Sequence, residues 1–206
     1  MAKLPSDYFK ETKEGLESRI PDYGTDGFQK MQDHIRKELS KEERSFDLLL
    51  RSFKILLLGD WNTEAKRKVL QGVRDTLLTA GYYAQTIDAY CDVNKPGGLL
   101  AQNILEYCCI NHQLIVFIDG EGKGTVTEVE FLRRNYVFQG KVLFFIDAAK
   151  FDGLKDNPRE YFRIFPTIVK VEAGELNETV LTYSRLRLYR IESCGKEVGN
   201  NERKSN

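Results

Sequence analysis

A short glycine-rich segment, Asp119-Gly-Glu-Gly-Lys-Gly-Thr-Val-Thr-Glu128, carries the residues best suited to chemistry. Both of its ends are carboxylates, and a pair of carboxylates can stabilise or trap a cationic centre while a leaving group is protonated. The glycines between them permit positive φ angles and the close approach of a ligand, and they are equally compatible with an ordinary flexible loop. The segment is therefore the first candidate for a ligand site.

The spacing of this segment differs from that of known phosphate-binding loops. A Walker loop needs Gly-Lys followed directly by Ser or Thr, whereas Gly124 stands between Lys123 and Thr125. The dinucleotide-binding fingerprint does not fit either. The sequence therefore disfavours a site for nucleoside triphosphates.

Glu128 has two interpretations. Thr125-Val-Thr-Glu128 matches a capping box, with Thr125 as the N-cap and Glu128 at the third helical position. Alternatively, Glu128 lies in the first turn of a helix and faces a ligand crevice, where the helix dipole stabilises its anion. That environment suits a nucleophile or a stabiliser of positive charge more than a general acid. From the residues alone, both interpretations stay open.

The elements that would position these residues begin at Phe53. Short apolar runs predict buried parallel strands, and apolar residues at intervals of three and four predict helices. We expect strands at 53–58, 82–87, 114–118, 141–146 and 167–171, and helices at 63–79, 99–111, 125–135 and 177–190. This alternation predicts an α/β fold, a three-layer doubly wound sheet of about five mainly parallel strands.

Two of the expected helices have predicted details. In helix 63–79 the inward face is expected to comprise Ala65, Val69, Val73, Leu77 and Ala80, with Gly81 just beyond the end of the helix. Asn177 is expected to be the N-cap of the last helix.

Polar residues follow several of the expected strands. They are Gly59, Asp60, Trp61 and Asn62 after the first, Asp88 and Asp92 after the second, Asp119 after the third and Asp147 after the fourth. Ligands of open α/β sheets bind beyond the carboxyl ends of the strands, where helix N-termini also point. We therefore expect these residues to border one crevice.

The rest of the chain divides by composition. Residues 1–52 are dense in charge and predict a helical N-terminal arm of two helices, packed on the domain or on another copy of the chain. Residues 53–193 form the expected α/β domain, and 194–206 are expected to be a polar tail. The arm thus makes a homo-oligomer one expected state of the protein.

Composition also excludes several classes of function. The chain has 31 basic and 31 acidic residues, so it lacks the basic excess that is typical of nucleic-acid binders. No apolar run approaches the length of a membrane span, and the N-terminus has no signal peptide. We expect a cytoplasmic protein that binds neither nucleic acid nor membrane.

The cysteines and histidines offer no metal-binding pattern. The four cysteines contain no C-x-x-C pair, and the two histidines have no matched ligand spacing. Neither a metal nor a cofactor is expected. His112 is expected to end a helix and to complement its dipole.

Three motifs together resemble the nucleoside 2-deoxyribosyltransferase-like superfamily, whose layout is similar to that of TIR-like nucleotide-processing folds. They are Leu57-Leu-Gly-Asp-Trp61, Leu114-Ile-Val-Phe-Ile-Asp119 and Gly124-Thr-Val-Thr-Glu128, within residues 53–150. The resemblance implies that Glu128 is the nucleophile that attacks the anomeric carbon of a nucleoside. It also implies that Asp119 assists or anchors the base and that residues 59–62 border the base or the sugar. Asp60 stands where the family carries a small residue or proline.

The first functional hypothesis is therefore an enzyme, a hydrolase or a transferase, that acts on the N-glycosidic bond of a nucleoside or nucleotide. Glu128 and Asp119 would be catalytic, and the substrate would contact the first-strand turn, Gly124 and Thr125. Asp88 and Asp92 could hydrogen-bond sugar hydroxyls, although neither matches a family motif. The alternatives are a module that binds or senses a nucleotide without breaking it and an interaction protein that inherited the fold.

Overall fold

The computed structural model describes residues 26–90, 99–153, 164–172 and 174–202. The chain divides into two compact units, residues 1–52 and 53–206, at the point where the sequence pattern changes. In the first unit the described part is one helix, α2 (Asp26–Ser52). It agrees with the second expected helix of the arm, and the first expected helix lies outside the described residues.

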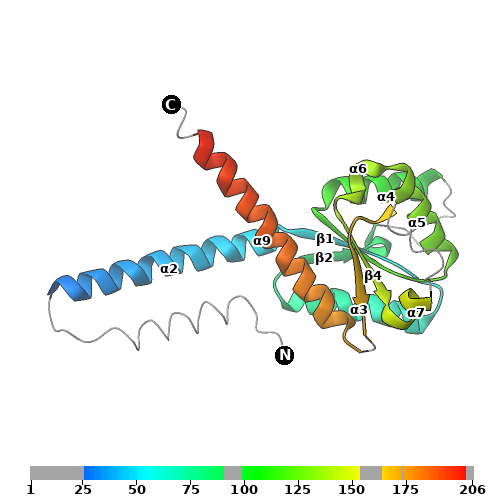
Figure 1. The fold of residues 1–206 in the computed structure, drawn as a ribbon, viewed down its shortest axis with the longest axis horizontal. Helices are drawn as coiled ribbons and strands as arrows, with labels where there is room; N and C mark the ends of the chain where they lie inside the picture. Colours follow the sequence, from blue (N-terminus) through cyan, green and yellow to red (C-terminus); the bar gives the residue numbers. More distant parts are fainter. Residues whose placement is uncertain (1–25, 91–98, 154–163, 173, 203–206) are drawn as a thin grey trace. The chain divides into compact units, whose positions relative to one another are not determined.

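Five strands form one parallel sheet in the second unit (Figure 1). Its spatial order is β2-β1-β3-β4-β5, and all four pairs of neighbouring strands are parallel. The strands are β1 (Lys54–Leu58), β2 (Tyr83–Thr86), β3 (Leu114–Ile118), β4 (Val142–Asp147) and β5 (Ile168–Val171). The predicted α/β fold with a parallel sheet is confirmed, and each strand lies within one or two residues of its predicted range.

Helices cover both faces of the sheet, which gives three layers. In Figure 1, α4, α5 and α6 lie on one face, and α3, α7 and α9 lie on the other. The helices are α3 (Glu64–Thr79), α4 (Leu99–Asn111), α5 (Lys123–Arg134), α6 (Tyr136–Gln139), α7 (Ala148–Gly153) and α9 (Leu176–Glu202). A single 3₁₀ turn, η1 (Ile87–Ala89), follows β2. The short helices α6 and α7 were not predicted.

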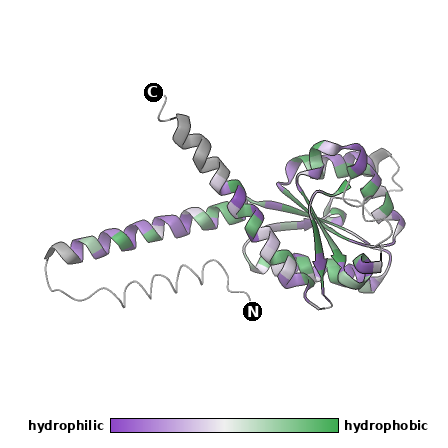
Figure 2. Ribbon diagram, in the orientation of Figure 1, coloured by the Kyte–Doolittle hydropathy of each residue, from purple (hydrophilic) through white to green (hydrophobic). Residues whose placement is uncertain are grey.

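The strands are apolar along their whole length because helices cover both of their faces. Residues 55–58 of β1 and 114–117 of β3 are fully buried, and Figure 2 shows the hydrophobic colour concentrated on the strands. On the α4–α6 face, the rings of Phe117 and Phe144 stack with centroids 5.3 Å apart. Phe165 stacks on Phe144 at 4.4 Å and completes an aromatic core on this face.

The prediction of the buried face of α3 is right for the second half of the helix and wrong for the first half. Val73 and Leu77 are buried as expected, but Leu70 is buried in place of Val69, which is 45% exposed. Ala65 is also exposed. The stripe that contacts the sheet follows the spacing 70-73-77-80, so the apolar character of Ala65 and Val69 was misleading. Gly81 has a φ of +90° after the C-cap Ala80, as the sequence predicted.

The last helix differs from its prediction at both ends. It begins at Leu176, so Asn177 lies inside the helix and is not its N-cap. It continues to Glu202, beyond the predicted end at Arg190, so residues 194–202 are helical and not an irregular tail. The stretch contains no proline, and two isolated glycines do not end a helix that is already formed.

None of the helices in the described parts of the chain is long and apolar enough to cross a membrane.

Candidate functional site

The carboxylate of Asp60 organises the carboxyl ends of β1 and β3. It accepts hydrogen bonds from the amide of Asn62 at 2.9 Å and from the amide of Glu121 at 3.2 Å. It also pairs with the ammonium of Lys66 in the first turns of α3. Asp60 is only 5% exposed. Burial alone would raise its pKa, but these three donors outweigh burial and hold the pKa below its usual value.

The glycines of the β3–α5 loop make room for this carboxylate. A side chain at Gly120 or Gly122 would collide with the side chain of Asp60, and at Gly122 also with that of Asn62. Neither glycine has a positive φ. The close approach that the sequence suggested therefore occurs, but the group that approaches these two glycines is Asp60.

Glu128 lies behind the first-strand turn. Its carboxyl is 7% exposed and accepts a hydrogen bond from the amide of Gly59 at 3.2 Å. Gly59 has a φ of +153°, and a Cβ there would lie 2.9 Å from the carbonyl oxygen of Ile118. Burial raises the pKa of Glu128 to about 8; the charge of Asp60 adds to this, and the Gly59 amide opposes it. At neutral pH Glu128 is therefore mainly a neutral carboxylic acid.

The first interpretation of Thr125 and Glu128, a capping box, is wrong. The N-cap of α5 is Gly122, whose carbonyl accepts the first helical bond from the amide of Val126 at 3.1 Å. The helix begins two residues earlier than expected because Asp60 holds the Glu121 amide and fixes the loop just before it. Thr125 is consequently the third helical residue, and within the described parts of the chain its buried hydroxyl has no hydrogen-bond partner. Glu128 is the sixth helical residue and faces β1.

A charged cavity of about 430 Å³ opens beyond the carboxyl ends of β3, β4 and β5. Its lining includes the last residues of these strands and the start of α9. The charged residues that line it are Lys66, Asp119, Glu121, Asp147, Lys150 and Glu172. With four carboxylates and two ammonium groups, the lining is negative overall.

Asp119 and Lys150 form the central ion pair of the charged cavity. The Nζ of Lys150 lies 2.5 Å from Oδ2 of Asp119 and 3.6 Å from Oε1 of Glu121. The side chain of Asp119 is 11% exposed, whereas that of Glu121 is 81% exposed. Lys150 is positioned by α7, whose first turn is capped by Asp147 accepting the Lys150 amide at 3.1 Å. Asp119 is thus a partly covered carboxylate that still reaches the cavity.

An apolar cavity of about 260 Å³ lies against α5 and shares Asp119 and Gly120 with the charged cavity. Its apolar lining is Val126, Val129, Phe144, Ile164 and Phe165. Thr125, Glu130 and Arg133 supply the polar groups of this lining. The two cavities therefore meet at the end of β3.

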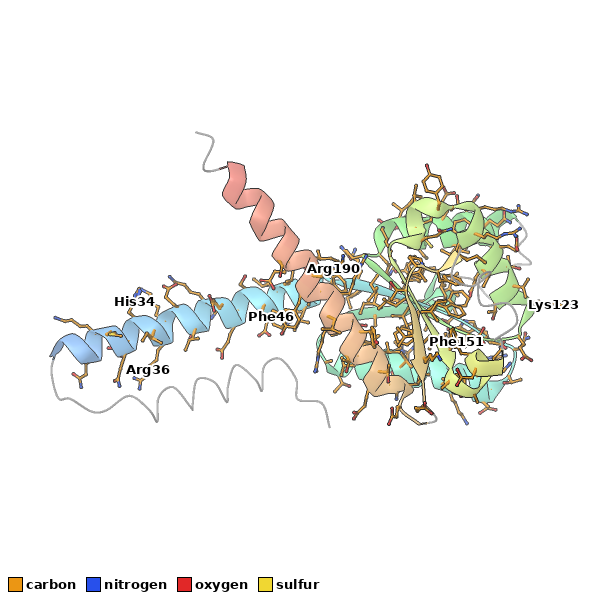
Figure 3. The ribbon with its side chains drawn as sticks, in the orientation of Figure 1. His34, Arg36, Phe46, Lys123, Phe151 and Arg190 are labelled. Atoms are coloured by element: carbon orange, nitrogen blue, oxygen red, sulfur yellow. The ribbon has the colours of Figure 1, made fainter. Side chains whose placement is uncertain are left out.

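The structure brings only some of the predicted site residues to these cavities. Asp119 lines both cavities and Thr125 lines the apolar one. Several others line neither of the two cavities, namely Gly59, Asp60, Trp61, Asn62, Asp88, Gly124 and Glu128. Asp88 is exposed in the turn η1, and Asp92 lies outside the described residues. Lys123 is also exposed and points away from the sheet (Figure 3).

Sequence reasoning missed the two lysines and two of the acids of the charged cavity. Lys66 and Lys150 lie within helices, where a surface lysine is the ordinary interpretation. Glu121 and Glu172 lie in loops. The available signal was the spacing Asp147-Ala-Ala-Lys150, in which an aspartate at a strand end caps the helix that carries the lysine.

The sequence suggested that His112 is a charged group at the end of α4, and the structure contradicts this. It is 2% exposed, and its Nδ1 lies 2.6 Å from the carbonyl oxygen of Cys108. Burial lowers its pKa, so the ring is neutral at physiological pH. Lys141 supplies the charge instead, because its Nζ donates to the carbonyls of Cys109 at 3.0 Å and His112 at 2.9 Å.

The cysteines of α4 are part of the core. Cys108 and Cys109 are both fully buried, and burial raises the pKa of Cys109 to about 12. In the described parts of the chain, His, Cys, Asp and Glu form no group of three or more that could hold a metal ion.

A comparison with models of known protein families gives no match, and neither does a comparison with curated proteins. The function is therefore argued from the site.

Proposed function

We propose that the second unit breaks or transfers the N-glycosidic bond of a nucleoside in the charged cavity. The observation that carries the proposal is the partly covered carboxylate of Asp119 in an acid-rich cavity at the carboxyl ends of the strands. Cleavage of such a bond develops positive charge on the sugar, in an oxocarbenium-like transition state. Carboxylates placed around that charge stabilise the transition state.

In this proposal Asp119 is the group that meets the anomeric carbon. Its carboxylate attacks this carbon, and the base leaves with the bonding electrons and takes up a proton from solvent water. Water, or a second base, then attacks the same carbon and frees Asp119. The ion pair with Lys150 supports this role because it holds the Asp119 carboxylate in place at the end of β3, where the two cavities meet.

Glu128, which the family resemblance makes the nucleophile, takes a different role here. A group with a pKa of about 8 is mainly protonated at neutral pH and is then a poor nucleophile. It also lines neither cavity. We assign it a positioning role, because its hydrogen bond to the Gly59 amide holds the first-strand turn beneath Asp60.

The charges of the cavity favour an uncharged nucleoside over a nucleotide. Both lysines are already paired with carboxylates, Lys66 with Asp60 and Lys150 with Asp119. A phosphate would add negative charge beside Glu121, Asp147 and Glu172 without a free cation in this lining. The proposal needs neither a metal nor a cofactor.

The test is release of free base from a panel of nucleosides, their 5′-monophosphates and NAD, followed by mass spectrometry. We expect release from at least one nucleoside, its loss in Asp119→Asn, and its retention in Glu128→Gln. The matched control is Asp75→Asn, which removes an exposed carboxylate on α3. If base release is lost in Glu128→Gln and retained in Asp119→Asn, Glu128 is the nucleophile and Asp119 is not. No release from any compound by the folded protein would refute the enzymatic function.

One observation favours a second function, in which the same cavity binds a nucleoside without breaking it. Asp119 is already bound by Lys150, so a bound sugar competes with an ion pair at 2.5 Å. A nucleoside that raises the melting temperature and is recovered unchanged after long incubation would support this sensing function. Self-association through the arm and a cytoplasmic location stay predictions.

A further inference from the structure

The lining of the apolar cavity has the chemistry of a site for an aromatic ring. Phe144 and Phe165 stack at 4.4 Å and lie in its wall, and Val126 and Val129 line it from α5. Flat heteroaromatic rings bind well against such side chains because they bury apolar area and pack against other rings.

One polar group in this lining has no hydrogen-bond partner among the residues that the structure describes. Thr125 is 2% exposed, and its hydroxyl is buried without a hydrogen bond. A buried hydroxyl without a partner costs free energy, and valine has the same shape without that cost. Thr127, two residues later, shows the ordinary arrangement, because its hydroxyl donates to the carbonyl of Lys123 at 3.0 Å. The unpaired hydroxyl of Thr125 therefore points to a ligand that supplies the missing partner.

The apolar cavity also has a defined relation to the proposed reaction. Asp119 and Gly120 line both cavities. A molecule with a flat ring on one side of Asp119 and a polar sugar on the other would place the bond between them beside the Asp119 carboxylate.

We propose that the apolar cavity is the compartment for the base of the nucleoside, with Thr125 as the residue that recognises it by a hydrogen bond. This inference rests on the proposed function for the identity of the ring. The ring packs against Phe144 and the valines of α5, and a ring nitrogen or exocyclic group bonds the Thr125 hydroxyl. The sugar then extends into the charged cavity.

The experiment measures binding of free bases to the full chain by calorimetry, with adenine, hypoxanthine, cytosine and uracil as probes. We expect at least one base to bind, and Thr125→Val to weaken its binding about tenfold through loss of one hydrogen bond. Thr125→Val should melt at the same temperature as the unmodified chain or higher, because it removes an unpaired buried hydroxyl. Thr127→Val is the matched control and should bind the base normally.

Three outcomes would overturn the proposal. They are no binding of any base at millimolar concentration, equal affinity in Thr125→Val, and equally tight binding of indole, which would make the cavity merely apolar. The failure of this inference is distinct from failure of the proposed function. If the protein releases base from nucleosides but binds no free base, only the proposed base compartment is refuted. If the protein binds a free base in a way that depends on Thr125 but releases no base from any nucleoside, only the proposed reaction is refuted.

Discussion

The buried acid Glu128 makes a sharp prediction about stability and pH. In the folded chain its pKa is about 8, because burial disfavours its anion, whereas its ordinary value is 4.5. Between these two pH values the folded state binds one more proton at Glu128 than the unfolded state does. Stability contributed by this group must therefore fall as the pH rises from 4.5 to 8. Glu128→Gln removes the titration and keeps an oxygen that can accept the Gly59 amide.

The magnitude follows from proton linkage. At about 1.4 kcal/mol for each pH unit, less near each pKa, the stability of Glu128→Gln relative to the unmodified chain should rise by about 3–4 kcal/mol between pH 5 and pH 8.

The assay is urea unfolding at pH 5, 6, 7 and 8, read from the fluorescence of Trp61, the single tryptophan of the chain. Glu130→Gln is the control, because it changes a half-exposed carboxyl that pairs with Arg133 on the same helix. At each pH, the free energy of unfolding of each variant is compared with that of the unmodified chain. If the difference in free energy of unfolding between Glu128→Gln and the unmodified chain does not grow as the pH rises, Glu128 is not a buried neutral acid.

Three further predictions concern the supports of the site, each measured by urea unfolding at pH 7. Gly122→Ala should destabilise the fold by about 1–3 kcal/mol because its Cβ meets Asp60, whereas Gly124→Ala, with open space around it, should stabilise the helix by about 0.5–1 kcal/mol; equal effects would contradict this. Asp60→Asn should cost about 1–3 kcal/mol, since it removes the charge that Lys66 and two amides bind, and a cost near zero would refute that role. Lys141→Met should cost about 1–2 kcal/mol by uncovering the carbonyls at the end of α4, and an unchanged midpoint would show that water replaces the ammonium.

The fold could be predicted well because its signals are local. Apolar runs such as residues 55–58 are long enough to mark a strand buried on both faces, and Gly81 marks the end of α3 by its position alone. The errors lie where a tertiary contact overrides a local pattern. Thr125 and Glu128 have capping-box spacing, but Asp60 fixes the loop before them and moves the start of the helix to Lys123.

The site could be predicted only in part, because its chemistry depends on groups far apart in the sequence. Asp119 was found, since a strand end in a parallel sheet faces the ligand edge. Its partner Lys150 lies beyond the next strand, and a lysine in a short helix carries no signal of that pairing. The neutral state of Glu128 also arises from burial under Gly59, which no spacing in its own helix indicates.

The position of Asp60 also has an evolutionary consequence. Its side chain occupies the crevice between β1 and β3, where a sheet of this strand order usually leaves space for a ligand. The residues at four positions therefore depend on one another. Asp60 needs Lys66 as its partner, and Asp60 leaves room only for glycine at 120 and 122. A lineage that replaced Asp60 by a small residue would release the two glycines from this constraint and reopen the crevice. Homologous chains should therefore change these four residues as a set, and chains that lack the acid should place their ligands one strand nearer to β1.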